Sequence, residues 1–166
     1  MTVFEALDIL KNYFEEAVKD DKFPVAIQKG DTEVKERAPE IHKMRLPKAS
    51  DAKKVAPYII IRYVNSIDKQ KEGQPSESGA VFRFIFCVYD SDEEQGALNL
   101  INLMDKMRMK LLRETVIGKK LKLNREDGLE MVAYEDDTAP YFAGEIIGTF
   151  YLRPIEREVY YEGEIF

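Results

Sequence analysis

The chain has 166 residues, of which 45% are hydrophobic and 34% charged, a composition typical of one soluble globular domain with a real core. No apolar run approaches the roughly 20 residues that span a bilayer. The first 21 residues are amphipathic and acidic, which fits neither a signal peptide nor a transit peptide. The net charge of −6 argues against a DNA-binding surface, so DNA would at most pass by without being held. The single cysteine, Cys87, excludes an intramolecular disulfide and is consistent with a reducing cytoplasm.

Residues 3–20 are predicted to form a helix, because apolar residues recur at the three-and-four spacing of one buried face. Thr2 and Glu5 have the spacing of a capping box, which would satisfy the first free amides of the helix. A short strand is predicted at 24–28. Residues 29–56 combine charge, two prolines and small residues, and are predicted to be a long loop with at most short ordered pieces.

Two strands are predicted next, at 58–64 and 80–90, since both segments are rich in β-branched and aromatic residues. Between them, residues 66–79 contain Ile67 as their one large apolar residue, and they are predicted to be a long mobile loop. One face of the second strand is the better core candidate because it is aromatic and aliphatic throughout. That face carries Phe82, Phe84, Phe86 and Val88.

A second helix is predicted to begin near Ser91, because Ser91 and Glu94 repeat the capping-box spacing. Its main apolar stripe consists of Ala97, Leu100, Ile101, Met104, Met107 and Leu111. Four further apolar residues lie off that stripe: Leu98, Leu103, Met109 and Leu112. The helix is thus apolar around more than one side. Either it packs on two sides within one subunit, or it also contacts a neighbouring subunit.

Residues 119–124 and 129–135 flank an Asp-Gly turn signal, which predicts a β-hairpin. The last strand is predicted at 141–152, where period-two alternation places Gly144 and Gly148 on the same face. The large residues of that face are Phe142, Ile146 and Phe150. A face that alternates large residues with glycines lets a helix approach the sheet closely. We therefore predict that these glycines and phenylalanines form the helix–sheet packing surface.

The order of these elements is helix, strands, helix, strands. It predicts an α+β fold, in which a mostly antiparallel β-sheet has two α-helices packed on one face and long loops between its strands.

The residues offer little catalytic chemistry. Cys87 lies between apolar neighbours in a strand, which favours an inert packed thiol over a nucleophile paired with His42. The acidic run around Asp136 lacks the ligand spacing of a calcium loop and indicates a solvated turn. The basic residues at 119–125 indicate surface solubility, or else contact with phosphates or an acidic partner. No phosphate-binding glycine loop, zinc spacing or nucleophile elbow occurs, so we predict no enzyme activity, cofactor or metal.

Several segments, in this order, resemble the tail terminator proteins of long-tailed bacteriophages, in the form found in phages and prophage-like particles of Gram-positive bacteria. The resemblance covers about residues 41–159 and includes the N-terminal helix by its position. The segments are "RLPKAS", "APYIIIRYV", "FRFIFCVYD", "LLRETVIGKKLKL" and "TAPYFAGEIIGTFYLRPIEREV". The most specific parts are Pro57-Tyr58, Val88-Tyr89-Asp90, and Pro140-Tyr141-Phe142 followed by Gly144-Glu145.

The resemblance implies a small α+β domain at 1–159, with an extension at 160–166, that assembles as a hexameric ring on the head-proximal end of the tail tube. Such a ring ends tube polymerisation and presents a surface to the head or neck. Its partners would be further copies of itself, the tail tube protein, a neck or head-connector protein and, in a contractile particle, the sheath protein. DNA would only pass through the lumen, and no membrane would be involved. The ring would belong to the tail–neck region of a virion or phage-like particle assembled in the host cytoplasm.

Three groups of residues are candidate contacts of such a ring. The polar loop at 66–79 carries Lys69 and Lys71, and we expect it to be mobile in the free protein and ordered in the ring. The aromatic residues of the extension are expected to dock on a neighbouring subunit or a neck protein; they are Tyr160, Tyr161 and Phe166. The third group consists of the off-stripe helix residues Leu98, Leu103 and Met109.

Two other functions remain open. The chain could be a neck or head-completion component of the same particle. It could also be a small α+β enzyme or ligand-binding module that uses the carboxylates near Asp136 or the Cys87–His42 pair.

Overall fold

The computed structural model describes residues 1–27, 30, 32–47, 55–135 and 138–158, together with the backbone of 160–161 and 164–165. The helices are α1 (Val3–Val18) and α2 (Glu93–Glu114). The three long strands are β4 (Tyr58–Lys69), β5 (Glu77–Tyr89) and β9 (Tyr141–Leu152). The shorter strands are β1 (Phe23–Pro24), β2 (Glu36–Arg37), β3 (Glu40–Lys43), β6 (Val116–Ile117), β7 (Leu121–Leu123), β8 (Leu129–Ala133), β10 (Tyr160–Tyr161) and β11 (Glu164–Ile165).

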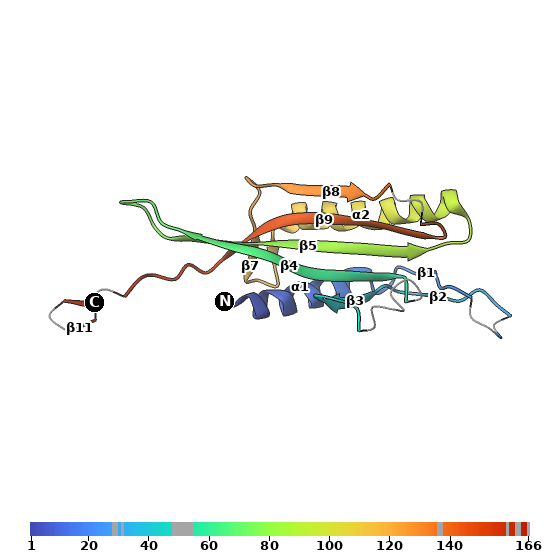
Figure 1. Cartoon of the computed structure of the whole chain (residues 1–166), viewed down its shortest axis with the longest axis horizontal. Helices are drawn as coiled ribbons and strands as arrows, with labels where there is room; N and C mark the ends of the chain where they lie inside the picture. Colours follow the sequence, from blue (N-terminus) through green and yellow to red (C-terminus); the bar gives the residue numbers. More distant parts are fainter. Residues whose placement is uncertain are drawn as a thin grey trace.

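Seven of the described strands form one sheet in the order β3-β4-β5-β9-β7-β6, with β8 also paired to β9. The pairs are antiparallel except for β3 and β4, which run parallel. Both helices lie on the same side of this sheet and share one core with it (Figure 1). The predicted α+β fold, a mostly antiparallel sheet with two helices on one face, is therefore confirmed.

Helix α1 begins with the predicted capping box. The Thr2 hydroxyl accepts a hydrogen bond from the Glu5 amide at 3.1 Å, and the Glu5 carboxylate accepts one from the Thr2 amide at 2.8 Å. The predicted cap of α2 is wrong, since Asp92 rather than Ser91 is the N-cap. The Asp92 carboxylate accepts from the Gln95 amide at 3.0 Å, while the Asp90 carboxylate accepts from the Asp92 amide at 3.0 Å. The carboxylates of Asp90 and Asp92 thus place the N-cap of α2 at residue 92, one residue after the predicted Ser91.

The predicted phenylalanine face of β5 is the centre of the core, and its side chains have no exposed surface. The Phe14 ring of α1 lies 4.7 Å from the Phe84 ring between centroids, and the Phe150 ring of β9 lies 6.1 Å from it. One aromatic cluster thus joins α1 to the two central strands.

The predicted loop at 66–79 is wrong over half of its length. Strands β4 and β5 remain paired from Ser66 opposite Ala80 out to Lys69 opposite Glu77, which leaves 70–76 as the turn. We call residues 64–81 the arm. It extends past the ends of both helices (Figure 1). The arm could not be predicted from side-chain patterns, because backbone hydrogen bonds between strands stabilise it. These include bonds from β9, which pairs with the β5 part of the arm as far as Ser78.

The predicted hairpin of 119–135 is also wrong. Strands β7 and β8 both pair with β9, at Lys122 opposite Tyr151 and at Leu129 opposite Gly148, so they lie end to end along one edge of β9. Between them, the Asn124 side-chain oxygen accepts hydrogen bonds from the amides of Glu126 and Asp127. The Asp-Gly signal therefore marks a compact turn that interrupts one edge strand, without reversing the chain.

The segment 29–56 contains two short strands among its described residues, in keeping with the prediction of short ordered pieces. Strand β3 pairs in parallel with the start of β4, with Ile41 opposite Ile59, and β2 pairs with β1. The buried Ile41 extends the core to the outer edge of the sheet.

A hydrogen bond from the Tyr13 hydroxyl to the Glu114 carboxylate joins α1 to the end of α2. Burial, and secondarily Glu114, raises the pKa of Tyr13 above its ordinary value of 10.0. A raised folded-state pKa contributes stability that is fully present below the unfolded pKa and is lost as the pH rises above it. We predict that Tyr13→Phe costs about 1 kcal/mol at neutral pH and flattens the loss of stability above about pH 10. Urea unfolding across that range checks this; parallel curves for the two proteins would contradict it.

Candidate interaction surfaces

Neighbouring elements closely approach both glycines of β9. A Cβ atom at Gly144 would lie 2.7 Å from the Met104 sulfur of α2 and 2.7 Å from the Val132 carbonyl oxygen. Helix α2 thus approaches the sheet at Gly144, as predicted. At Gly148 the predicted helix contact is wrong, because a Cβ there would lie 2.5 Å from the Leu129 side chain of β8. The neighbouring strand fills this gap, since β8 pairs with β9 at this position.

A third close contact, between helix α2 at Gly96 and the Phe142 ring of β9, was not predicted from the sequence. A Cβ atom at Gly96, in the first turn of α2, would overlap the ring of Phe142. Phe142 therefore packs beneath the start of the helix, while Phe150 is fully buried farther along β9. The available signal was Gly96 itself, because a glycine inside a helix costs about 1 kcal/mol relative to alanine and suggests a packing reason.

Helix α2 exposes apolar side chains on the side that faces away from the sheet. Leu98, Ile101 and Met109 are 56%, 42% and 46% exposed. Ile101 was expected in the buried stripe, and the prediction of Leu103 as an interface residue is wrong, since Leu103 is only 3% exposed. The helical period places Leu103 beside Leu100, Met104 and Met107, toward the sheet. We call Glu94, Leu98, Ile101, Asp105, Arg108 and Met109 the outer stripe of α2.

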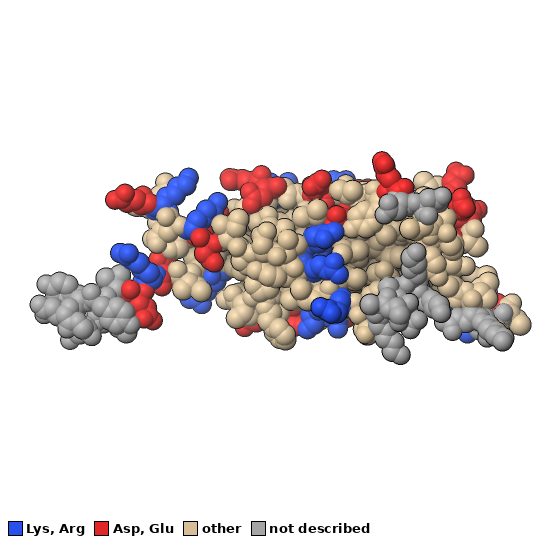
Figure 2. Space-filling view, viewed as in Figure 1, with Lys and Arg blue, Asp and Glu red and all other residues tan. Residues whose placement is uncertain are grey.

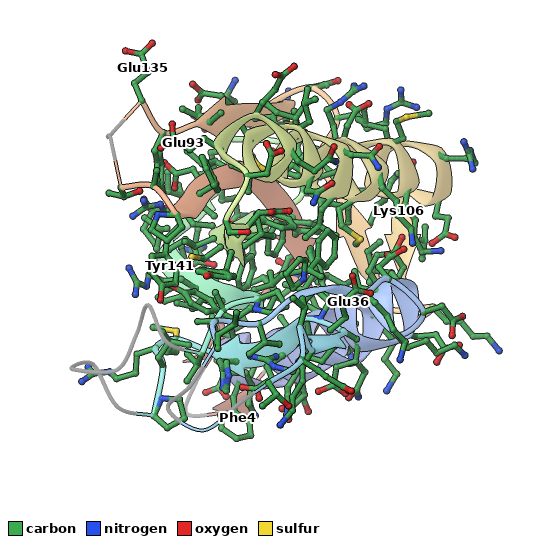
Figure 3. The ribbon with its side chains drawn as sticks, turned by 90° about the vertical axis from the view of Figure 1, so that its right-hand side faces the viewer. Phe4, Glu36, Glu93, Lys106, Glu135 and Tyr141 are labelled. Atoms are coloured by element: carbon green, nitrogen blue, oxygen red, sulfur yellow. The ribbon has the colours of Figure 1, made fainter. Side chains whose placement is uncertain are left out.

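The opposite side of the sheet carries no helix in the described part of the chain. Figure 3 looks along the molecule and shows both helices on one side of the sheet, with Tyr141 on the other. Near Tyr141 this side is partly covered by a second, smaller cluster of buried residues. That cluster consists of Leu46, Ala56, Tyr58, Ile60 and Cys87.

Toward the arm, the same side keeps its outward residues partly or fully exposed. We call nine of these residues, all on β4, β5 and β9, the open face: Arg62, Ile67, Gly79, Val81, Arg83, Glu145, Ile147, Thr149 and Tyr151. Asn65 of β4, Lys122 of β7 and Glu130 of β8 lie on the same side of the sheet. Figure 2 shows this side of the molecule as largely uncharged, with a band of basic side chains across its middle.

An ion pair occupies the centre of the open face. The Arg83 guanidinium donates to the Glu145 carboxylate, and the two side chains are 34% and 12% exposed. The hydrogen bond to Glu145 raises the pKa of Arg83. Arg62 lies directly opposite Arg83 in the β4–β5 ladder, and its Nε donates to the Met44 carbonyl at 3.0 Å. The open face therefore carries one paired and one additional arginine, beside apolar residues and the polar Thr149.

Of the remaining predicted contact residues, Lys69, Lys71 and the backbone of Tyr160 and Tyr161 lie at the same end of the molecule as the arm (Figure 1). Lys69 is the last residue of β4 and Lys71 belongs to the exposed turn of the arm. Tyr160 and Tyr161 form β10, of which only the backbone is described, and Phe166 lies outside the described residues.

The residues considered for catalysis do not converge. His42 is on β3 and Cys87 on β5, with β4 between them, so their backbones are about 10 Å apart. His42 Nε2 lies 3.1 Å from the Glu40 carboxylate, and Cys87 is buried. Asp136 lies outside the described residues. Within the described part of the chain, no group of three or more His, Cys, Asp or Glu side chains could hold a metal ion.

A hollow of about 570 Å³ beside α1 has mixed charge and is lined by Met1, Glu5, Asp8, Ile9, Lys120 and Arg153. Of the predicted basic patch, Lys120 lies in this hollow and Lys122 lies over the Tyr151 ring, 5.8 Å from its centroid. Neither helix in the described residues has the length and apolar character needed to cross a membrane.

Comparison with known proteins gives no family assignment: no protein-family model matches the chain, and no curated protein sequence matches it significantly.

Proposed function

We propose that this protein is a tail terminator of a bacteriophage or phage-like particle, a ring of identical subunits that caps the head-proximal end of a tail tube. The resemblance of the segment order supports this proposal, and it alone supplies the hexameric number. The ring would end tube growth and offer its outer surface to a neck, head-connector or sheath protein.

The observation that carries the proposal is the distribution of exposed surface. Among the exposed apolar residues of this small α+β subunit, Leu98, Ile101 and Met109 lie on the outer stripe of α2, and Ile67 lies on the open face on the other side. The arm extends from the same subunit past the helices. Two lateral surfaces and one axial extension suit a subunit that must contact both its ring neighbours and the tube below.

Tube assembly in vitro tests the function directly. The tail tube protein of the same particle is polymerised with and without this protein, and tube lengths are measured by electron microscopy. A terminator shortens and narrows the length distribution in proportion to its amount, and it is found at one tube end. A neck or head-completion protein leaves the tube lengths unchanged, and that result would overturn the proposal.

The arm offers a selective variant of this experiment. Replacing residues 70–76 by Asn-Gly joins Lys69 to Glu77, which are already paired, through a turn suited to two-residue hairpins. We predict that stability changes by no more than about 0.5 kcal/mol, because the removed residues lie outside the core. Tube capping is expected to fall sharply if the arm makes the axial contact. Urea unfolding and the tube-length measurement are compared; full capping by the shortened protein would contradict an axial role for the arm.

A further inference from the structure

The open face departs from the pattern of a sheet surface that stays in water. An antiparallel sheet with one solvated face usually alternates apolar residues inward with polar residues outward. From Gly79 to Tyr89 and from Tyr141 to Tyr151, the outward positions include just two charged residues, Arg83 and Glu145, and these pair with each other. A half-exposed surface of this composition is typical of a protein contact.

The open face also contains a shallow hollow that does not serve the subunit's own packing. It has a volume of about 80 Å³. Ile67, Val81 and Tyr151 form its apolar lining around Gly79, and its polar lining includes Lys69, Glu77 and Asp127. A Cβ atom at Gly79 would have its nearest neighbours at 3.5 and 3.6 Å, which is ordinary contact. Gly79 is therefore not required by crowding, in contrast to Gly144. The hollow can receive an apolar side chain from outside the subunit.

The size of the open face suits a subunit contact. It spans three strands, β4, β5 and β9, at a spacing of about 4.8 Å and roughly eight residues at about 3.3 Å each, or about 400 Å² of sheet. Standard interfaces bury about 800 Å² on each partner. The area is thus that of a modest contact, of the kind that gains strength when every subunit of a closed ring makes two of them.

The outer stripe of α2 complements the open face in position and charge. A head-to-tail contact requires two different patches on each subunit, and these two surfaces lie on different sides of it (Figure 3). Among the nine residues of the open face, Arg62 is the charged side chain outside the Arg83–Glu145 pair, and Lys69, Glu77 and Asp127 line the adjoining hollow. Glu94 is the charge left on the outer stripe once Asp105 pairs with Arg108, 2.8 Å away. Arg62 on the open face and Glu94 on the outer stripe are therefore opposite in charge, and each lies beside apolar residues.

We propose that the outer stripe of α2 of one copy packs on the open face of the next copy, in a head-to-tail contact that repeats around the ring. This inference rests on the proposed ring and specifies which surfaces build it. A symmetric sheet-to-sheet pair would leave the stripe with Leu98 and Met109 uncovered, whereas the head-to-tail contact covers both surfaces of every copy.

Two lysine substitutions test the contribution of each surface to self-association separately. Leu98→Lys lies on the outer stripe and Ile67→Lys on the open face, and the native side chains are 56% and 59% exposed. Val34→Lys is the matched control, because Val34 is 68% exposed and belongs to neither surface. All three variants are expected to fold with stabilities within about 0.5 kcal/mol of the native protein, which urea unfolding verifies. Solution mass is measured over a series of concentrations for each protein.

The native protein and Val34→Lys are expected to form the same oligomer. Leu98→Lys and Ile67→Lys are each expected to weaken self-association about tenfold or more and to remain monomeric. Mixed in equal amounts, the two monomeric variants should form a heterodimer, because the mixture retains one intact pair of surfaces. A native protein that is monomeric throughout, native-like assembly of either variant, or a mixture without heterodimers would overturn the proposal.

The tube-length measurement keeps this inference distinct from the proposed function. If the native protein limits tube length but neither lysine variant changes its assembly, the function stands and the assigned contact is wrong. If the mixing experiment succeeds but tube length is unaffected, the contact stands and the terminator function is wrong.

Discussion

Gly144→Val is expected to destabilise the protein by about 3 kcal/mol or more. A β-carbon at this position would lie 2.7 Å from the Met104 sulfur and 2.7 Å from the Val132 carbonyl oxygen. The methionine can move, but the carbonyl belongs to β8, which is paired with β9 at this point. Either α2 lifts from the sheet or the β8–β9 ladder opens, and both changes expose buried core. Urea unfolding measures the loss.

Gly79→Ala is the matched control, because Gly79 also lies within a central strand but has no neighbour closer than 3.5 Å to the added carbon. It should be neutral or slightly stabilising, since alanine restricts the unfolded chain more than glycine does. Equal effects of Gly79→Ala and Gly144→Ala on the free energy of unfolding would show that close packing is not the reason for Gly144.

The nature of the obstructing atoms leads to a second comparison. At Gly148 the nearest atom is the end of the flexible Leu129 side chain, so Leu129→Ala should recover much of the packing strain of Gly148→Ala. Met104→Ala should recover less of the strain of Gly144→Ala, because the Val132 carbonyl remains in place. Double-mutant cycles separate these couplings from the cavity that each alanine creates on its own.

The parts of the fold that were predicted correctly are those whose stability comes from burial or from hydrogen bonds between residues close in sequence. The face of Phe82 and Phe84, the capping box at Thr2 and the final strand all leave a periodic or local signal in the sequence. The arm left no such signal. Most of its residues are polar, and its order depends on the pairing of β4 with β5 and of β5 with β9. An Asp-Gly pair was likewise insufficient to distinguish a hairpin from a turn that interrupts an edge strand, since both need the same local conformation.

The candidate surfaces were only partly predictable for a related reason. Hydrophobicity identified α2 as apolar on more than one side, but it could not assign Leu103 to the core and Ile101 to the surface. That assignment depends on the rotation of the helix over the sheet, which Met104 above Gly144 and Gly96 above Phe142 fix. The open face was not identified at all, because outward residues of a strand look the same in sequence whether a partner covers them or not.

Phe14→Ala is expected to cost 3–5 kcal/mol, about the loss typical of a large buried aromatic residue. The Phe14 side chain is fully buried, and its ring lies 4.7 Å from the Phe84 ring and 6.3 Å from the Phe86 ring. Its removal leaves a cavity between α1 and the sheet that the two rings of β5 cannot fill, because their backbones are held by pairing with β4 and β9. Chemical unfolding should show a lower midpoint with an unchanged slope.

Phe4→Ala on the same helix is the control. Phe4 is 68% exposed and contacts Lys43, whose ammonium lies 5.0 Å from the ring centroid, so its loss should cost no more than about 1 kcal/mol. The contrast also separates stability from assembly, because neither residue belongs to the outer stripe or the open face. If Phe14→Ala is as mild as Phe4→Ala, α1 is not anchored through this aromatic cluster. If instead Phe4→Ala abolishes self-association, α1 takes part in the subunit contact and the assigned surfaces are incomplete.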